Sequence, residues 1–256
     1  PEWQTVSPAL FNVLEHALQV SKLTSGAFDV TIGPLVNLWG FGPTRNHYAT
    51  EVPSDTVIIR VLQHTGYEKL QLAPEIKQIR KTDSELYVDL SGIAKGYAVD
   101  QIANYLDKKA IQHYLVEIGG ELIGKGRNTR GEAWQIGIEQ ALPLNRSVQR
   151  IVSLDNLAMA TSGDYRNYYE KDGLRYSHTL DPATGKPIRH RLASVTVLHE
   201  SCMHADAMAT AFMVMGPEKA LQLANEQQVP IYMIVKSGDG FEERYTDKFK
   251  TYLNKL

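Results

Sequence analysis

A glycine-bracketed turn between a predicted strand and a predicted helix has the residue types that bind phosphate. An apolar stretch ends in Asp89, and Gly92, Lys95 and Gly96 follow within the next seven positions. Backbone N–H groups and the positive end of the helix would face the anion, and Lys95 would add a full charge. The spacing matches neither a Walker loop nor a dinucleotide fingerprint, so a turn that Asp89 merely caps is the alternative.

A carboxylate and a hydroxyl lie one helical turn apart near the C-terminal third of the chain. Asp206 and Thr210 are at positions i and i+4, so on a helix they project from one face, among small residues. Both are hard oxygen donors of the kind that Mg²⁺ prefers, and Mg²⁺ usually completes its coordination with water and substrate phosphates. The alternative is an acidic residue placed near a helix N-terminus by the helix dipole, with an incidental threonine.

A single histidine precedes a turn rich in proline and glycine. His178 lies in the segment SHTLDPATGKP, where Asp181 and Gly185 predict a sharp loop. The imidazole could accept a proton or contact a phosphate. A structural histidine is the alternative.

Composition indicates an ordinary soluble protein. The 256 residues are 43% hydrophobic and 22% charged, with a net charge of −2, which predicts one compact body, possibly with two lobes, and no nucleic-acid partner. Cys202 is the single cysteine, so an internal disulfide is excluded. No apolar run reaches the roughly 18 residues of a membrane span.

Predicted helices and strands alternate along the chain. Ser7 and Pro8 begin an apolar stripe typical of a helix that stops by Gly26. Further helices are predicted over residues 54–66, 95–109 and 204–228. Two strands are predicted within 75–90, the second over 86–90, and further strands near 176–180, 194–199 and 231–235. Residues 113–126, 134–140 and 148–161 are predicted to be β-rich stretches broken by Gly-Gly, Asn and Pro. Residues 27–53 lack a steady period and are predicted to be a structured loop. The mixture predicts an α+β or mixed α/β fold.

Six segments, in this order, resemble the ApbE family, the FAD:protein FMN transferases. They are GAFDVTIGPL at 26–35 with WGF at 39–41, DLSGIAKGY at 89–97, EIGGE at 117–121, ATSGD at 160–164, SHTLDPATGKP at 177–187 and ADAMAT at 205–210. The resemblance covers nearly the whole chain. It implies one ApbE-like flavin transferase domain over residues 1–256, with FAD and a metal in a cleft.

The resemblance implies roles for residues spread along the sequence. The residues implied to contact FAD are Ala27, Phe28 and Asp29 in the pocket lining, Asp89 and Lys95 near the phosphates, and Leu180 or Ile188 through the backbone. Mg²⁺ is implied at Asp206, Thr210 and a backbone carbonyl, which we expect to be that of Gly92. His178 matches the family histidine beside the phosphates, and either His178 or Asp206 is the expected proton acceptor.

The implied reaction is Mg²⁺-dependent transfer of FMN from FAD to a Thr or Ser hydroxyl of an acceptor protein, with release of AMP. The implied acceptors are proteins such as subunits of a respiratory redox complex. Two alternatives stay open: a metal-dependent FAD pyrophosphatase that gives FMN and AMP, and a flavin-binding module without catalysis.

Family members usually carry further residues ahead of the first helix. A Met-Gly-Thr segment and a strand there contribute to the adenine side of the FAD pocket, and the sequence given opens at Pro1 without that segment. A lipoprotein signal is also common in bacterial members and is not seen here. The resemblance therefore implies a periplasmic protein whose full-length precursor is an inner-membrane lipoprotein.

Overall fold

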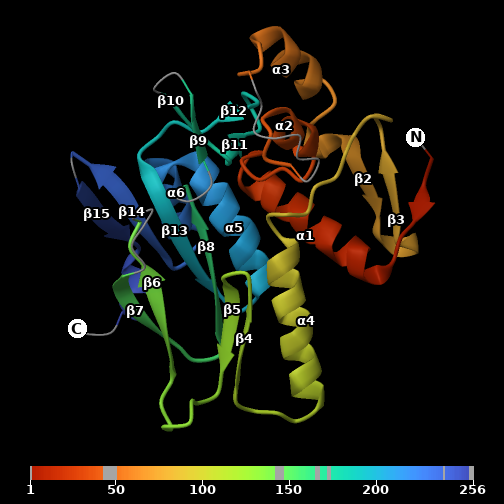
Figure 1. Cartoon of the computed structure of the whole chain (residues 1–256). Coiled ribbons are helices and arrows are strands. Elements are labelled where there is room, and N and C mark those ends of the chain that lie inside the picture. The colour runs from red at the N-terminus through yellow and green to blue at the C-terminus, as the bar shows by residue number, and fades with distance from the viewer. Residues whose placement is uncertain are drawn as a thin grey trace. The chain divides into compact units, whose positions relative to one another are not determined.

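The computed structural model describes residues 2–42, 51–141, 147–164, 168–171, 174–238 and 240–253. Helices and strands are mixed throughout, which confirms the predicted fold class. The chain divides into two compact units (Figure 1). Unit 1 comprises Pro1–Gly92 and Asn167–Arg189, and unit 2 comprises Ile93–Arg166 and His190–Leu256.

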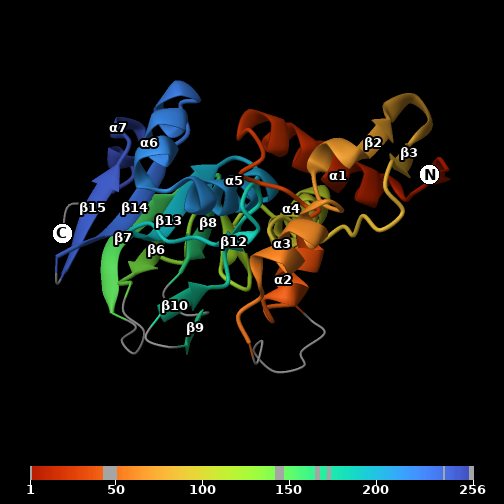
Figure 2. The ribbon, with the colours of Figure 1, turned by 90° about the horizontal axis from the view of Figure 1, so that it is seen from above.

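Unit 1 combines short helices with small antiparallel sheets. Its elements are β1 Gln4–Thr5, α1 Pro8–Leu23, α2 Gly33–Leu38, α3 Asp55–Leu62, η1 Tyr67–Lys69, β2 Leu70–Ala73, η2 Pro74–Ile76, β3 Gln78–Lys81, β9 Tyr168–Lys171, β10 Leu174–Ser177, β11 Leu180–Asp181 and β12 Lys186–Pro187. The strands pair in the order β1-β3-β2, and β9 with β10 and β11 with β12 form two-stranded sheets. Figure 2 shows α1 beside β2 and β3.

Local sequence explains the helices of unit 1. The Ser7 hydroxyl accepts a hydrogen bond from the Leu10 N–H at 3.2 Å, and Pro8 is the first helical residue, so α1 begins where predicted. The predicted helix after Ser54 is α3. An apolar cluster lies around α2, with buried members Leu35, Trp39, Ile58, Tyr176 and Leu180.

Unit 2 is built on a six-stranded antiparallel sheet. Its elements are α4 Ala94–Lys108, β4 Tyr114–Ile118, β5 Glu121–Lys125, β6 Trp134–Glu139, β7 Val148–Leu154, β8 Leu157–Gly163, β13 Leu192–His199, α5 Cys202–Met215, α6 Pro217–Glu226, β14 Ile231–Ser237, β15 Gly240–Tyr245 and α7 Asp247–Lys250. The order in the sheet is β15-β14-β13-β8-β5-β4, and β6 pairs with β7.

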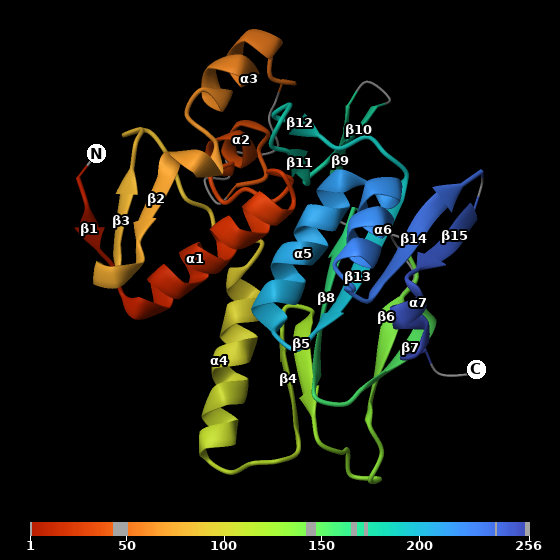
Figure 3. The ribbon, with the colours of Figure 1, turned by 180° about the vertical axis from the view of Figure 1, so that it is seen from behind.

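The sheet has an apolar core on each face, because alternate side chains of a strand point to opposite faces. Ile123 and Ala158 pack with Val99 of α4 in one cluster, and their neighbours Leu122 and Met159 belong to a second cluster with residues of β6 and β7. Figure 3 shows α4 and α5 along one face of the sheet. The strand β13, which is buried along almost its whole length, lies between β8 and β14 at the centre.

Three secondary-structure predictions were wrong. Residues 86–90 are not a strand in the structure, although the Asp89 N–H donates to the Val30 carbonyl at 2.7 Å. The helix predicted over 204–228 is two helices, because Gly216 has a φ of 78° and Pro217 starts α6. The predicted loop over 27–53, of which 43–50 lie outside the described residues, contains α2.

Within the described residues, none of the helices has the length and apolar character that a membrane crossing requires.

Candidate active site

A close contact between α4 and α5 creates the site in unit 2. A Cβ atom at Gly96 would lie 2.3 Å from the Cys202 carbonyl oxygen and 2.8 Å from the Asp206 Cβ, so only glycine permits this approach. Gly96 is the third residue of α4, where a backbone N–H has no partner within the helix. The approach lets this N–H donate to the Asp206 Oδ2 atom at 2.9 Å.

Asp206 therefore serves as a cap for α4 from a different helix. Ile93, at the N-cap position of α4, makes no side-chain cap hydrogen bond. The Asp206 carboxylate lies at the positive end of the α4 dipole, which favours its ionised form. Its second oxygen, Oδ1, lies 3.9 Å from the Lys95 ammonium.

A second buried carboxylate reaches Lys95 from the sheet. The Lys95 Nζ atom lies 2.5 Å from the Glu121 Oε2 atom. The side chains of Glu121 and Asp206 are each 5% exposed, and that of Lys95 is 42% exposed. When both carboxyls are ionised, the one ammonium leaves one negative charge on this cluster, which a cation would neutralise.

Burial sets the electrostatics of both carboxylates. It raises the pKa of the Asp206 carboxyl, against the opposing effects of Lys95 and the Gly96 N–H. Burial likewise raises the pKa of Glu121; Lys95 opposes this shift and the charge of Asp206 adds to it. In the ligand-free protein each carboxylate is thus less easily ionised than in water.

The predicted pair of Asp206 and Thr210 lies on α5, as the spacing required. The Thr210 Oγ1 atom is 3.5 Å from the Oγ atom of Ser162 on β8, so two hydroxyls meet one turn beyond the carboxylate. Ser162 and Glu121 carry no signal of their own for a role in the site, although both lie within segments that carry the family resemblance. Only the fold brings them to α5.

The donor set fits a magnesium ion. Among the described residues, the nearest charged partner of the Asp206 Oδ1 atom is the Lys95 ammonium at 3.9 Å, and Thr210 offers a hydroxyl. Mg²⁺ needs only one or two protein carboxylates when substrate phosphates and water supply the other ligands. Across the described residues, no three His, Cys, Asp or Glu side chains gather into a metal-binding group. Gly92 is the last residue of unit 1, so its carbonyl stays a predicted ligand.

The turn predicted to bind phosphate begins in unit 1 with Asp89. The Asp89 Oδ1 atom accepts hydrogen bonds from the Ser91 N–H at 2.9 Å and from the Ser91 hydroxyl, so Asp89 caps its own turn. A Cβ atom at Gly33 would lie 3.1 Å from the Asp89 Cβ. Segments 27–33 and 87–89 therefore lie side by side, which brings together two of the groups predicted to contact FAD.

Asp29, another predicted FAD residue, is buried and fully hydrogen-bonded. Its Oδ1 atom accepts from the Thr31 N–H at 2.8 Å and from the Thr31 hydroxyl at 2.7 Å. Its Oδ2 atom accepts from the Tyr67 N–H at 2.9 Å, and the Thr31 hydroxyl oxygen accepts from the Gly66 N–H at 2.7 Å. Asp29 thereby ties two distant segments together, and its neighbours Ala27, half-buried, and Phe28, 4% exposed, begin the same segment.

His178 lies at the edge of an aromatic cluster in unit 1. Its ring meets Phe41 edge-on at 6.3 Å between centroids, and Tyr169 stacks on Tyr176 at 5.1 Å. The side chains of Leu180 and Ile188 are buried, and their backbone contact with the flavin stays a prediction. The Asp181 carboxylate accepts from the Ala183 N–H and the Thr184 hydroxyl, which forms the expected turn.

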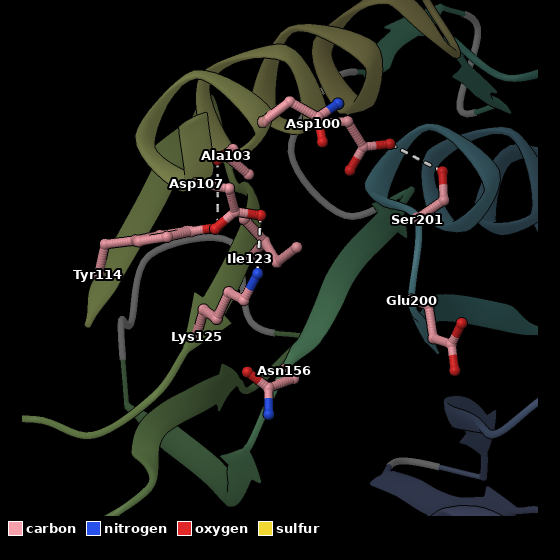
Figure 4. A pocket seen from close by; sticks show the side chains of 10 residues that line it. Asp100, Ala103, Asp107, Tyr114, Ile123, Lys125, Asn156, Glu200 and Ser201 are labelled. Carbon is pink, nitrogen blue, oxygen red and sulfur yellow. Dashed lines mark hydrogen bonds and ion pairs between the residues drawn. The ribbon is translucent and has the colours of Figure 1, made fainter. Parts of the chain in front are cut away.

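A pocket of about 310 Å³ opens elsewhere in unit 2, beside the start of α5 (Figure 4). Two of its three carboxylates, those of Asp100 and Asp107, have partners, and the third belongs to Glu200. Asp100 accepts hydrogen bonds from the Ser201 hydroxyl and from the N–H groups of Cys202 and Met203, and so caps α5. Asp107 is bound by Lys125 at 2.7 Å and by the Tyr114 hydroxyl at 2.9 Å. These contacts are structural.

The chain is similar to proteins of known function along its length. The ApbE family model matches residues 1–233. A FAD:protein FMN transferase of Vibrio cholerae serotype O1 is 50% identical over 98% of this chain and 74% of its own length. One of Escherichia coli K12 is 40% identical over 97% of this chain and 71% of its own.

Solved structures agree with these relatives. The flavin transferase ApbE from Vibrio cholerae superposes with a TM-score of 0.90 at 48% identity, covering 98% of this chain and 79% of that chain. The apo form of the Pseudomonas stutzeri flavinyl transferase ApbE gives a TM-score of 0.88 at 42% identity, covering 98% and 77%. This chain belongs to the ApbE family.

Proposed function

We propose that this chain is a FAD:protein FMN transferase that moves FMN from FAD to a Thr or Ser hydroxyl of an acceptor protein, with Mg²⁺ as cofactor. Family membership and the names of relatives up to 50% identical support the transferase activity. The observation that carries the metal dependence is the pair of buried carboxylates with only one ammonium between them.

The transfer exchanges a phosphoanhydride bond for a phosphoester bond. The acceptor oxygen forms a bond to the FMN phosphorus, the anhydride bond of FAD breaks, and AMP leaves with the bridging oxygen. When bound, Mg²⁺ would neutralise negative charge on the pyrophosphate and on the departing AMP. Asp206 and Thr210 would hold it, with the Gly92 carbonyl as the predicted third protein ligand.

Two residues of the chain act on the substrates directly in this proposal. Lys95, at the start of α4, pairs with a non-bridging phosphate oxygen. The acceptor hydroxyl gives its proton to His178, because the Asp206 carboxylate already accepts from Gly96 and serves the metal.

The acceptor and the cellular location are also proposals and rest on the family resemblance. We propose an acceptor such as a subunit of a respiratory redox complex, and a periplasmic, membrane-anchored enzyme.

One assay tests the proposed function by its products. The purified chain is incubated with FAD and Mg²⁺, with and without a purified respiratory-complex subunit that carries a Thr flavinylation site. We expect flavin fluorescence on the subunit in a denaturing gel, one AMP per flavin attached, and no transfer in EDTA. Free FMN and AMP without labelled subunit would identify a pyrophosphatase, and bound but unaltered FAD would identify a binding module. Either result contradicts the proposal.

A further inference from the structure

Glu121 is held in place by a tight turn. The strands β4 and β5 are joined by Gly119 and Gly120, with Ile118 paired to Glu121 across the turn. Both glycines have positive φ, 62° and 104°, the conformation of the tight two-residue hairpin. Glu121 is therefore fixed as the first residue of a strand that lies inside the sheet between β4 and β8.

The same turn leaves room for Lys95. A Cβ atom at Gly119 would lie 3.3 Å from the Lys95 Cδ atom, so any other residue there would press on the lysine stem. Among the described residues, the Glu121 Oε2 atom accepts no hydrogen bond of ordinary geometry. Its ion pair with Lys95 at 2.5 Å is therefore what compensates its buried charge.

The Lys95 ammonium lies between two carboxylates and is closer to Glu121. It is 2.5 Å from Glu121 and 3.9 Å from the Asp206 Oδ1 atom. If Glu121 did not hold it, the nearest anion would be that Oδ1 atom. A lysine paired there would compete with a cation for the same oxygen.

We infer that Glu121 is a positioning residue that holds Lys95 away from Asp206, which leaves the Asp206 Oδ1 atom to Mg²⁺ and the lysine to a phosphate. The inference rests on the proposed function, because it concerns the metal and phosphate groups of that reaction. It differs from a general structural role, because Glu121 acts only through Lys95.

A double-mutant cycle on Mg²⁺ binding tests the inference without turnover. Mg²⁺ affinity is measured by calorimetry, without FAD, for the parent, Glu121→Gln, Lys95→Met and the double variant. We expect Glu121→Gln alone to weaken Mg²⁺ binding about tenfold relative to the parent, because the Lys95 ammonium then pairs with the Asp206 Oδ1 atom. In the Lys95→Met background, where no competing cation is left, the same change should weaken binding less than about threefold.

Two further variants separate position from charge. Glu117→Gln removes a carboxylate exposed on the same hairpin and should leave Mg²⁺ affinity at the parent value. Glu121→Asp keeps the charge and should recover part of the lost affinity. Melting curves check that each variant is folded.

The inference is overturned if Glu121→Gln weakens Mg²⁺ binding equally with Lys95 and with Met at position 95, because Glu121 would then act through its charge alone. It is also overturned if Glu121→Gln does not change Mg²⁺ affinity when Lys95 is present. A parent that binds no Mg²⁺ also overturns it. The proposed FMN transfer is judged separately, by labelled subunit and AMP, so the two can fail independently.

Discussion

Asp29 in unit 1 and Asp206 in unit 2 are both buried aspartates whose pKa values burial raises, yet their surroundings differ. Both oxygens of Asp29 accept hydrogen bonds, from Thr31 and from Tyr67. Within the part of the chain that the structure describes, one oxygen of Asp206 accepts a backbone N–H, and the other faces a lysine 3.9 Å away.

The difference teaches how to separate a structural carboxylate from one that binds a ligand. Burial and a raised pKa are common to both, so neither property identifies function. The two aspartates differ in how many carboxylate oxygens are still able to bind a ligand. Both oxygens of Asp29 have hydrogen-bond partners within its own unit, whereas Asp206 shares one ammonium with Glu121 and keeps one oxygen for a cation. Substitutions should therefore affect folding at Asp29 and chemistry at Asp206.

The largest expected effect is on activity at Asp206. Asp206→Ala removes the only carboxylate proposed to bind Mg²⁺, so FMN transfer should fall by roughly a thousandfold or more and excess Mg²⁺ should not restore it. The melting temperature should stay near the parent value, because a buried charge leaves together with one hydrogen bond. Rates of FMN transfer across a Mg²⁺ series measure this, and a parent-like rate would place the metal elsewhere.

The next effect is on stability at Asp29. Asp29→Ala leaves the N–H groups of buried Thr31 and partly buried Tyr67 without their acceptors, so the protein should lose about 2–5 kcal/mol of stability and melt roughly 5–15 °C lower. The binding free energy of FAD to the folded variant should change less than the free energy of unfolding does. A variant that melts like the parent but fails to bind FAD would show that Asp29 contacts the ligand directly.

The smallest effect is expected at Thr210. Thr210→Val is nearly isosteric and removes one neutral oxygen, so Mg²⁺ affinity should fall about three- to tenfold. High Mg²⁺ should restore the rate, since water can take the vacant position. Ser162→Ala is the matched control for the neighbouring hydroxyl, and it should have a smaller effect if Thr210 is the ligand. If both substitutions lowered Mg²⁺ affinity equally, both hydroxyls would be ligands of the ion.

Local patterns predicted much of this molecule. Ser7 and Pro8 set the start of α1, and the i, i+4 spacing placed Asp206 and Thr210 on one helix. Gly216 with Pro217 is itself a helix-stop signal, so the break between α5 and α6 was predictable from local rules. The six residues of α2 are too few for a helical period to be recognised.

Roles that depend on distant partners were not predictable from the residues alone. Asp29 is tied to Tyr67, which is 38 positions away, and Gly96 to Asp206, which is 110 positions away. The sequence carries no periodic signal for such pairs. The family resemblance pointed to Asp29 and Asp206 alike, and only the geometry distinguishes a saturated carboxylate from one with an oxygen to spare.

Thermal unfolding of Asp206→Asn, with and without Mg²⁺, tests the central claim most directly. A raised pKa in the folded state means that the folded protein holds more protons than the unfolded chain between the two pKa values. Stability therefore falls as pH rises through that window. Asparagine removes this cost and keeps an acceptor for the Gly96 N–H.

At about pH 8 and in EDTA, Asp206→Asn should melt above the parent, and the difference should shrink as the solution is acidified below the window. Mg²⁺ should raise the melting temperature of the parent and leave that of Asp206→Asn unchanged. Asp29→Asn, the matched control, should melt below the parent and keep the Mg²⁺ increment. An Asp206→Asn variant that is less stable than the parent in EDTA, or that gains as much from Mg²⁺, would contradict the account.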